Sequence, residues 1–175
     1  MPRGPGAPPL FLADSMLGRL ARYLRFLGFD TLYERQIADA LLLARAQSEG
    51  RILLSRDTGI FETRAVASGA IGALLLHSSD TIEQLRQVAG ELELGKYIGR
   101  LPSRCVDCNG PLEELARAQA RQLVPPFVLA TQIEISYCPC CNHCVWRGSH
   151  WDNVMARIPV LGVWPGDSAP RGLQA

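Results

Sequence analysis

Leu10-Phe11-Leu12-Ala13-Asp14-Ser15, followed directly by Met16 to Leu27, is the stretch of sequence that decides the fold. The uninterrupted apolar run at its start predicts a strand buried on both faces, as in a parallel sheet. The next residues switch to helical spacing, with Ser15 available as the N-cap and Gly28 closing the helix in the left-handed conformation. Asp14 is therefore expected at the carboxyl end of a strand, where open parallel sheets bind ligands. The alternative is that Asp14 only caps the helix.

The alternation of strand and helix continues to about residue 92. Further strands are expected over residues 29–33, 51–55 and 70–76, and helices over residues 40–49, 60–68 and 81–92. Gly50 and Gly69 are placed to close two of these helices, and Asp80 with Glu83 forms a capping box that opens the last one. Repeated alternation predicts an α/β fold, with a parallel sheet, right-handed crossovers and helices on both faces.

The composition of the 175-residue chain divides it into four parts. Residues 1–9 and 157–175 are rich in proline and glycine and are expected to be flexible tails. Residues 10–100 are expected to form the α/β domain. Residues 101–156, where the cysteines begin, are expected to form a small β domain that includes a hairpin or a pair of short strands over residues 127–137.

The overall composition is that of an ordinary globular protein, with 47% hydrophobic and 20% charged residues. No apolar run approaches the ~18 residues that span a bilayer, and the first nine residues lack the features of a signal peptide, so a cytoplasmic location without membrane contact is expected. The formal net charge of +1 gives no global basic field, so any nucleic-acid surface must be local. Lys96 is the only lysine, and this preference for arginine is weak evidence for phosphate contacts.

All six cysteines lie between Cys105 and Cys144, which favours metal binding over disulfides in a cytosolic chain. Two Cys-x2-Cys pairs suit a tetrahedral structural zinc site built from two knuckles. Cys141 with Cys144 is a valid choice for the second pair, and Cys140 and His143 are near enough to compete. The preferred zinc ligands are Cys105, Cys108, Cys138 and Cys141. Four protein ligands leave no open position, so the zinc is expected to stabilise and not to catalyse.

Three carboxylates are expected at one edge of the sheet. Asp14 and Asp57 each follow an apolar strand, and Asp39 begins a helix after the second strand. Helix capping explains each of them alone, but three together suit a hard divalent cation such as Mg²⁺ or Mn²⁺, which is held by a few carboxylates and waters. Further acids near this edge are Asp80, Glu34 and Glu62.

Two kinds of motif are missing from the sequence. No G-x-x-x-x-G-K-[ST] motif occurs, and no G-x-G-x-x-G follows a strand, which argues against mononucleotide and dinucleotide cofactors. No catalytic serine or cysteine triad pattern occurs either.

Five features together point to a known family. They are Phe11-Leu12-Ala13-Asp14 with Met16-Leu17-Gly18-Arg19-Leu20-Ala21-Arg22, then Gly50-Arg51-Ile52-Leu53-Leu54-Ser55-Arg56-Asp57, the paired cysteines, Val124-Pro125-Pro126, and Gly148-Ser149-His150-Trp151. Over about residues 10–155 the chain resembles the Mut-seven C-terminal ribonuclease domain, a PIN-like nuclease fold followed by a zinc ribbon. The resemblance implies a metal-dependent ribonuclease whose carboxylates are Asp14, Asp39 and Asp57. PIN-like nucleases often have a fourth acid, which no residue here supplies unambiguously, and Cys140 and Cys144 depart from the simplest ribbon pattern.

The expected reaction is hydrolysis of RNA phosphodiester bonds. Asp14 and Asp57 are expected to bind Mg²⁺ or Mn²⁺ directly, with Asp39 as a further ligand or as the base that orients water. The RNA, expected to be single-stranded, is predicted to contact residues on both domains through phosphate contacts and base stacking: Arg19, Arg22, Arg56, Trp146, His150 and Trp151.

Two other classes of function remain open at this stage. The first is an RNA-binding adaptor in which the acids are only helix caps. The second is a metal-dependent phosphatase on a doubly wound sheet, because a fold does not fix its chemistry. The adaptor would bind RNA without cutting it, whereas the phosphatase would release phosphate from small monoesters.

Overall fold

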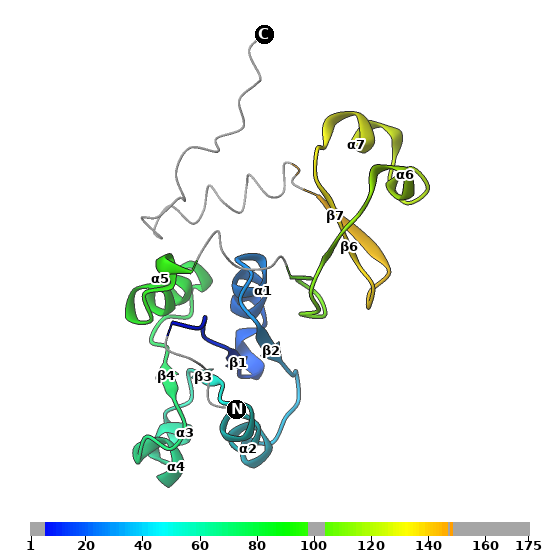
Figure 1. Ribbon diagram of the computed structural model, residues 1–175. Coiled ribbons are helices and arrows are strands. Elements are labelled where there is room, and N and C mark those ends of the chain that lie inside the picture. The colour runs from blue at the N-terminus through cyan, green and yellow to red at the C-terminus, as the bar shows by residue number, and fades with distance from the viewer. Residues whose placement is uncertain (1–5, 98–103, 147, 149–175) are drawn as a thin grey trace.

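The computed structural model describes residues 6–97, 104–146 and 148. Several sequence predictions concern residues outside this part of the chain: the domain boundary near residues 100–101, most of the N-terminal tail, the C-terminal tail over residues 157–175, and the RNA contacts His150 and Trp151. The described residues form a parallel sheet with helices, followed by a small antiparallel sheet (Figure 1).

The parallel sheet has four strands in the order β2-β1-β3-β4. Their bounds are β1 Phe11–Ala13, β2 Thr31–Tyr33, β3 Ile52–Ser55 and β4 Ala73–Leu75. In the register, Ala13 lies opposite both Tyr33 and Leu54. The carboxyl ends of β1, β2 and β3 therefore lie side by side at one edge of the sheet.

Helices cover both faces of this sheet, as the alternating sequence predicts. Phe11 and Ala13 pack in one buried cluster with α1 (Gly18–Phe26) and α5 (Thr81–Glu91). Leu12 points the other way and packs with α2 (Asp39–Glu49) and α3 (Thr58–Glu62). Figure 1 shows the same arrangement, with α1 and α5 above the strands and α2, α3 and α4 (Arg64–Ala67) below them.

Helix starts and breaks differ from the prediction in three places. Ser15 is not the N-cap, because Asp14 caps the short 3-10 helix η1 (Ser15–Leu17), from which α1 continues. The helix predicted over residues 60–68 is divided at Thr63, whose backbone is extended and whose hydroxyl donates to Ile60 O at 2.6 Å. That local hydrogen bond competes with the helical pattern. Asp80 caps α5, but its own N–H donates to Ser78 Oγ at 3.0 Å and not to Glu83.

The C-terminal part is an antiparallel sheet in the order β5-β6-β7. Its elements are β5 Glu113–Glu114, α6 Arg117–Ala120, α7 Pro126–Thr131, β6 Ile135–Cys138 and β7 His143–Trp146, and η2 (Leu94–Lys96) follows α5 in the preceding part. The hairpin predicted over residues 127–137 is wrong in its first half, because Pro126 begins a helix there. Proline is favoured at the first helical position, where its missing N–H costs nothing.

The longest helices in the described ranges, α2 and α5, have 11 residues each. None of the helices there is both long enough and apolar enough to cross a bilayer.

Candidate active site and metal centre

Asp14 and Asp57 follow β1 and β3, and a buried hydroxyl between them joins the two. Ser55, which is fully buried, donates from Oγ to Asp14 Oδ2 at 2.7 Å. The same Oγ accepts the N–H of Asp57 at 3.0 Å. The hydrogen bonds follow from the register, because Asp14 N also pairs with Leu54 O at 3.0 Å. The ends of β1 and β3 are thus held together at the point where the two acids lie.

Both acids also cap helices. The other oxygen of Asp14 accepts the N–H of Ser15, and Asp57 Oδ1 accepts the N–H of Gly59 at 2.8 Å. Asp57 Oδ2 has no partner within the described residues. Asp14 is only 8% exposed, whereas Asp57 is exposed. The carboxylate of Asp57 therefore faces solvent with one oxygen uncommitted.

Asp39 stands apart from this pair. It is exposed at the first position of α2, where Ala38 is the N-cap. Within the described ranges, the clusters of acidic, cysteine and histidine side chains whose ligand atoms lie within 4.8 Å of one another do not include Asp14, Asp39 and Asp57 together. Asp14 and Asp57 lie at neighbouring strand ends and Asp39 begins α2, so within the described residues the three acids do not form a compact triad.

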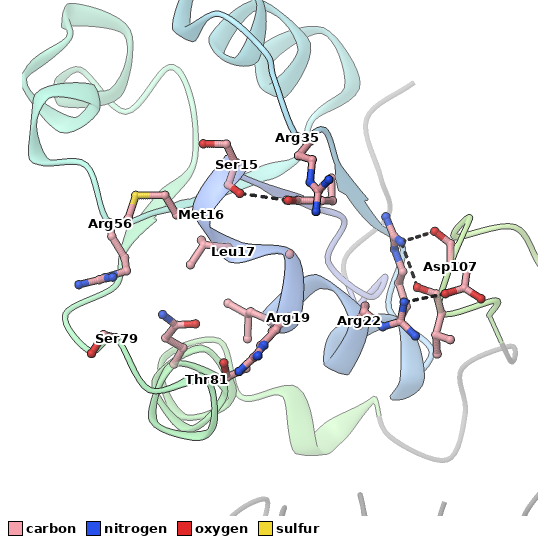
Figure 2. A pocket seen from close by; sticks show the side chains of 16 residues that line it. Ser15, Met16, Leu17, Arg19, Arg22, Arg35, Arg56, Ser79, Thr81 and Asp107 are labelled. Atoms are coloured by element: carbon pink, nitrogen blue, oxygen red, sulfur yellow. Dashed lines mark hydrogen bonds and ion pairs between the residues drawn. The ribbon is translucent and has the colours of Figure 1, made fainter. Parts of the chain in front are cut away.

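A cavity of about 620 Å³ begins next to Asp14, at Ser15. It lies between η1, α1, the end of β2 and the start of α5, as Figure 2 shows. Five arginines and a single acid line it, together with hydroxyl and apolar side chains: Arg19, Arg22, Arg25, Arg35, Arg56, Asp107, Ser15, Ser79, Thr81, Tyr33 and Met16. All three arginines predicted to bind RNA, Arg19, Arg22 and Arg56, are in this cavity.

Two of these arginines hold the first cysteine knuckle against α1. Arg25 Nη1 donates to Val106 O at 3.1 Å and to Asp107 O at 2.7 Å. Arg22 Nη1 forms an ion pair with Asp107 at 2.7 Å (Figure 2). Burial lowers the pKa of Arg25, although the nearby cysteines and Asp107 oppose this effect. An arginine keeps its charge despite such a shift, so Arg25 still binds both carbonyl oxygens as a cation.

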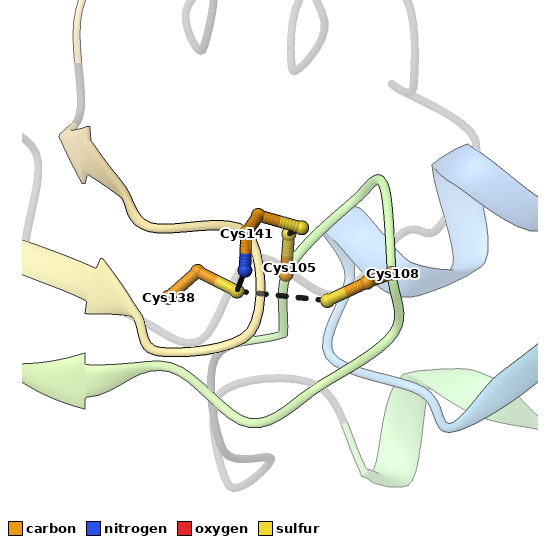
Figure 3. A group of neighbouring side chains, drawn as sticks. All are labelled: Cys105, Cys108, Cys138 and Cys141. Carbon is orange, nitrogen blue, oxygen red and sulfur yellow. Dashed lines mark hydrogen bonds between the residues drawn. The ribbon is translucent and has the colours of Figure 1, made fainter.

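The four cysteines preferred from the sequence come together at the tip of the small sheet. The sulfur atoms of Cys105, Cys108, Cys138 and Cys141 all lie within 4.8 Å of one another (Figure 3). Across the two knuckles, the Sγ atoms of Cys105 and Cys141 are 3.8 Å apart and those of Cys108 and Cys138 are 3.5 Å apart. Zinc–sulfur bonds of about 2.3 Å in a tetrahedron place the sulfurs roughly 3.8 Å apart. The cluster can hold a metal ion such as zinc.

The thiols in this cluster differ in how readily they lose a proton. Contact with the Cys108 thiol, aided by burial, raises the pKa of Cys141 well above that of an ordinary thiol. Burial also raises the pKa of Cys138, but the N–H of Cys141 and the neighbouring thiols outweigh it and lower this pKa overall. A bound cation favours deprotonation of every ligand, so metal binding is expected to release protons.

The competing ligands lie at different distances from this cluster. His143 Nε2 is 4.0 Å from Cys105 Sγ, and it forms a second possible group with Cys105 and Asp107. Cys140 is exposed, and Cys144 packs with the apolar residues of the small sheet, where burial raises its pKa. Cys140 and Cys144 therefore lie outside the four-sulfur cluster.

The knuckle is fastened to the parallel sheet by further polar contacts. Asn109 Oδ1 accepts the N–H of Thr31 at 2.9 Å, and its Nδ2 donates to Asp30 Oδ1 at 2.9 Å. Asp30 also forms ion pairs with Arg51 at 2.7 Å and with Arg104 at 3.1 Å. Burial raises the pKa of Asp30, but the hydrogen bonds from Asn109 and Arg51 and the charges of Arg51 and Arg104 outweigh it, so the pKa is below its usual value.

Sequence reasoning missed three residues of this region. Ser55 ends a strand and was not singled out, since only the register places it opposite Asp14. Arg35 lines the cavity but follows the second strand in a segment without a clear pattern. Asn109 sits beside Cys108 with a left-handed backbone, φ +69°, and the Asn-Gly pair at residues 109–110 was the available signal for a turn there.

Comparison with known proteins identifies a family. No curated protein and no solved structure matches the chain. The family model described as Mut7-C RNAse domain matches residues 9–158, which include both sheets, the acids and the cysteine cluster. Since this match covers most of the 175 residues, the chain belongs to the Mut7-C RNase domain family.

Proposed function

We propose that this protein is a metal-dependent ribonuclease that hydrolyses phosphodiester bonds in single-stranded RNA. The observation that carries the proposal is the pair Asp14 and Asp57, joined through Ser55 at the carboxyl ends of neighbouring parallel strands. Membership in an RNase domain family supports RNA as the substrate. The arginine-lined cavity beside Asp14 gives the polyanion a place to bind.

The acids fit a hard divalent cation. Mg²⁺ and Mn²⁺ bind one or two carboxylates in such sites and complete their coordination with waters and substrate phosphates, so a compact carboxylate triad is not required. Asp57 and Asp14 would hold the cation, and the uncommitted Oδ2 of Asp57 is available to it. Bound there, the cation supplies activation of water and stabilisation of the leaving oxygen.

The protein side chains then have separate tasks. Ser55 fixes the orientation of the Asp14 carboxylate through its 2.7 Å hydrogen bond. Asp39, exposed at the start of α2, serves as a further ligand or orients the attacking water. Arg19, Arg22 and Arg56 bind phosphate oxygens of the substrate and so position the scissile bond.

The small sheet has a structural role in this proposal. Cys105, Cys108, Cys138 and Cys141 bind one zinc ion, which holds the two knuckles together. The knuckle in turn places Val106 and Asp107 in the wall of the cavity. Trp146, His150 and Trp151 stack on bases of the RNA.

The test is cleavage of labelled single-stranded RNA with and without Mn²⁺. Asp14→Asn and Asp57→Asn should each lower the Mn²⁺-dependent rate by at least about 100-fold, because each removes a charged ligand. The stability of Asp57→Asn should change by less than about 1 kcal/mol, because asparagine is itself a good N-cap. Asp14→Asn should cost about 1–2 kcal/mol, because asparagine has one oxygen where Asp14 accepts hydrogen bonds on two. Asp80→Asn is the matched control: Asp80 caps α5 in the same way, and this variant should cut RNA at the normal rate.

One observation favours the adaptor as a second candidate. Asp14 and Asp57 do cap helices in the structure, and capping alone would explain why both residues are acidic. An adaptor would bind RNA equally well with and without Mn²⁺ and would leave it intact. Full cleavage activity in both Asp14→Asn and Asp57→Asn would reject the mechanism proposed here.

A further inference from the structure

We propose that the arginine-lined cavity binds a terminal phosphate of the RNA, so that cleavage occurs close to a phosphorylated end. This inference rests on the ribonuclease function proposed above and concerns which RNA the site selects. The ligand is a phosphomonoester on a single-stranded RNA end, carried either at the 5′ or at the 3′ position.

The charge of the cavity is the first argument. Five guanidinium groups and one carboxylate line it, although the whole chain has a net charge of only +1. A terminal phosphate carries about −1.5 to −2 charges near neutral pH and three unesterified oxygens. A phosphate inside the RNA backbone carries a single charge and has two such oxygens. The excess of guanidinium groups therefore matches a chain end better than it matches one backbone phosphate.

The arginines also differ in whether they are already engaged. Arg22 is paired with Asp107, and Arg25 is bound to backbone carbonyls. Within the described residues, the side chains of Arg19, Arg35 and Arg56 have no hydrogen bond or ion pair. Figure 2 shows these three around the turn formed by η1. Their guanidinium groups are fork-shaped donors that suit phosphate oxygens, and within the described residues they have no protein partner.

One donor among them is buried. Arg56 Nε is shielded from solvent and has no hydrogen-bond partner among the residues that the structure describes. Buried donors are nearly always satisfied, and an exception calls for an explanation. Arg56 lines the cavity, so the rest of its guanidinium group is what it offers to a phosphate bound there.

The walls and the volume of the cavity suit the end of an RNA chain. Val106 and Asp107 of the knuckle line one side, and Arg25 fixes both of them by their carbonyl groups. A volume of about 620 Å³ is in the range of pockets that enclose a whole ligand, such as one nucleotide with its phosphate. Because Ser15 lines the cavity and directly follows Asp14, the bound end lies next to the acids.

The experiment compares three RNAs of one sequence that differ only at their ends. One has a 5′-phosphate, one has a 3′-phosphate, and one has hydroxyl groups at both ends. Binding is measured by fluorescence anisotropy on the zinc-loaded protein without added Mn²⁺, so that no RNA is cut. We expect one phosphorylated RNA to bind at least 10-fold more tightly than the hydroxyl-ended RNA, and the better of the two identifies the end.

Variants then locate the effect. Arg35→Gln should remove most of this preference while changing the affinity for hydroxyl-ended RNA much less. Arg56→Gln, which also removes a contact to backbone phosphates, should reduce the preference and lower the affinity for all three RNAs. Arg64→Gln, an exposed arginine on α4 outside the cavity, is the matched control and should keep the full preference. Equal affinity for all three RNAs, or a preference that survives both cavity variants, would overturn the inference.

A cleavage assay with Mn²⁺ on the same RNAs separates this inference from the proposed function. Cleavage of all three RNAs at equal rates and at unrelated positions would leave the ribonuclease standing and overturn the end-binding site. An end preference in binding without any cleavage would support the end-binding site and overturn the proposed ribonuclease function. Failure to bind any of the three RNAs would overturn the end-binding site, and the cleavage result would still decide the ribonuclease.

Discussion

The Ser55 hydroxyl makes two hydrogen bonds at the proposed cation site. It is fully buried, donates to Asp14 Oδ2 at 2.7 Å and accepts from Asp57 N at 3.0 Å. A serine can donate one hydrogen bond and accept others, so it satisfies both groups at once. No other hydroxyl in the described ranges joins the two acids in this way. Ser55 is therefore a positioning residue for the proposed cation site, although it does not touch the substrate.

Replacing Ser55 by alanine tests this role. Removing the hydroxyl leaves Asp14 Oδ2 and the Asp57 N–H without this partner, which should lower the free energy of unfolding by about 1–3 kcal/mol. The Mn²⁺ concentration needed for half-maximal cleavage should also rise several-fold, because the Asp14 carboxylate is then oriented by the Ser15 N–H alone. Affinity for RNA without Mn²⁺ should stay the same. Ser68→Ala, at an exposed serine on the far end of α4, is the control for both measurements. An unchanged Mn²⁺ requirement would show that Ser55 is only structural.

The first cysteine knuckle is the element that joins the two sheets. On the α1 side, Arg25 donates to the carbonyl oxygen of Asp107, and Arg22 forms an ion pair with the Asp107 side chain. On the β2 side, the Thr31 N–H donates to Asn109. A metal bound at Cys105 and Cys108 would fix the loop between them, and this loop carries Val106 and Asp107 into the cavity wall. The metal is thus expected to stabilise part of the parallel sheet as well as the small domain.

Metal analysis tests this element directly. Purified protein should contain about one zinc per chain, and Cys138→Ser should lose it, because a tetrahedral site needs all four sulfurs. Cys140→Ser is the matched control, since Cys140 is exposed and outside the cluster, and it should retain the zinc. In Cys138→Ser the N–H of Thr31, which donates to Asn109, should exchange with solvent at least about 10-fold faster by hydrogen exchange. A metal-free protein with a folded ribbon would contradict the prediction.

How well the sequence predicts each element depends on how much of the signal is local. The apolar run before Asp14 and the glycines Gly28 and Gly50, at φ +94° and +61°, predict β1 and the ends of α1 and α2 correctly. The segment of α7 is apolar and short, and such a run suits a strand and a helix equally, so the packing of Val128 in the small core decides it. Asp14 and Asp57 could be placed at their strand ends from sequence alone. The links through Ser55 and Arg35 could not, because they depend on register and on contacts between distant segments.

Across the whole molecule, one carboxylate ties the two parts together. Asp30, at the start of β2, is paired with Arg51 of the parallel sheet and with Arg104 and Asn109 of the knuckle segment. Its side chain is 21% exposed, so solvent screens these pairs only in part. Asp30→Asn should therefore lower the free energy of unfolding by about 2 kcal/mol at neutral pH.

The pH dependence of this effect has a definite sign. The pKa of Asp30 is lowered in the folded protein, whereas the unfolded value is about 3.9. The unfolded state therefore binds the proton more readily, and the contribution to stability is complete above about pH 4–5 and is lost as pH falls through the folded pKa. Urea unfolding from pH 7 to pH 3 should show the gap between wild type and Asp30→Asn narrowing below about pH 4. Glu114→Gln, at an exposed residue of β5, should show no such gap at any pH.

Thr31 lies on β2, an outer strand of the parallel sheet, and side chains occupy both of its backbone polar groups. Asn109 accepts its N–H at 2.9 Å, and Arg25 donates to its carbonyl oxygen at 2.8 Å. An outer strand with free N–H and C=O groups can pair with a strand of another molecule and start aggregation. With a metal holding the loop, Asn109 would help to shield this edge of the sheet from neighbouring copies of the protein. Loss of metal from the cysteine cluster is therefore expected to expose the edge and to drive the protein into insoluble aggregates.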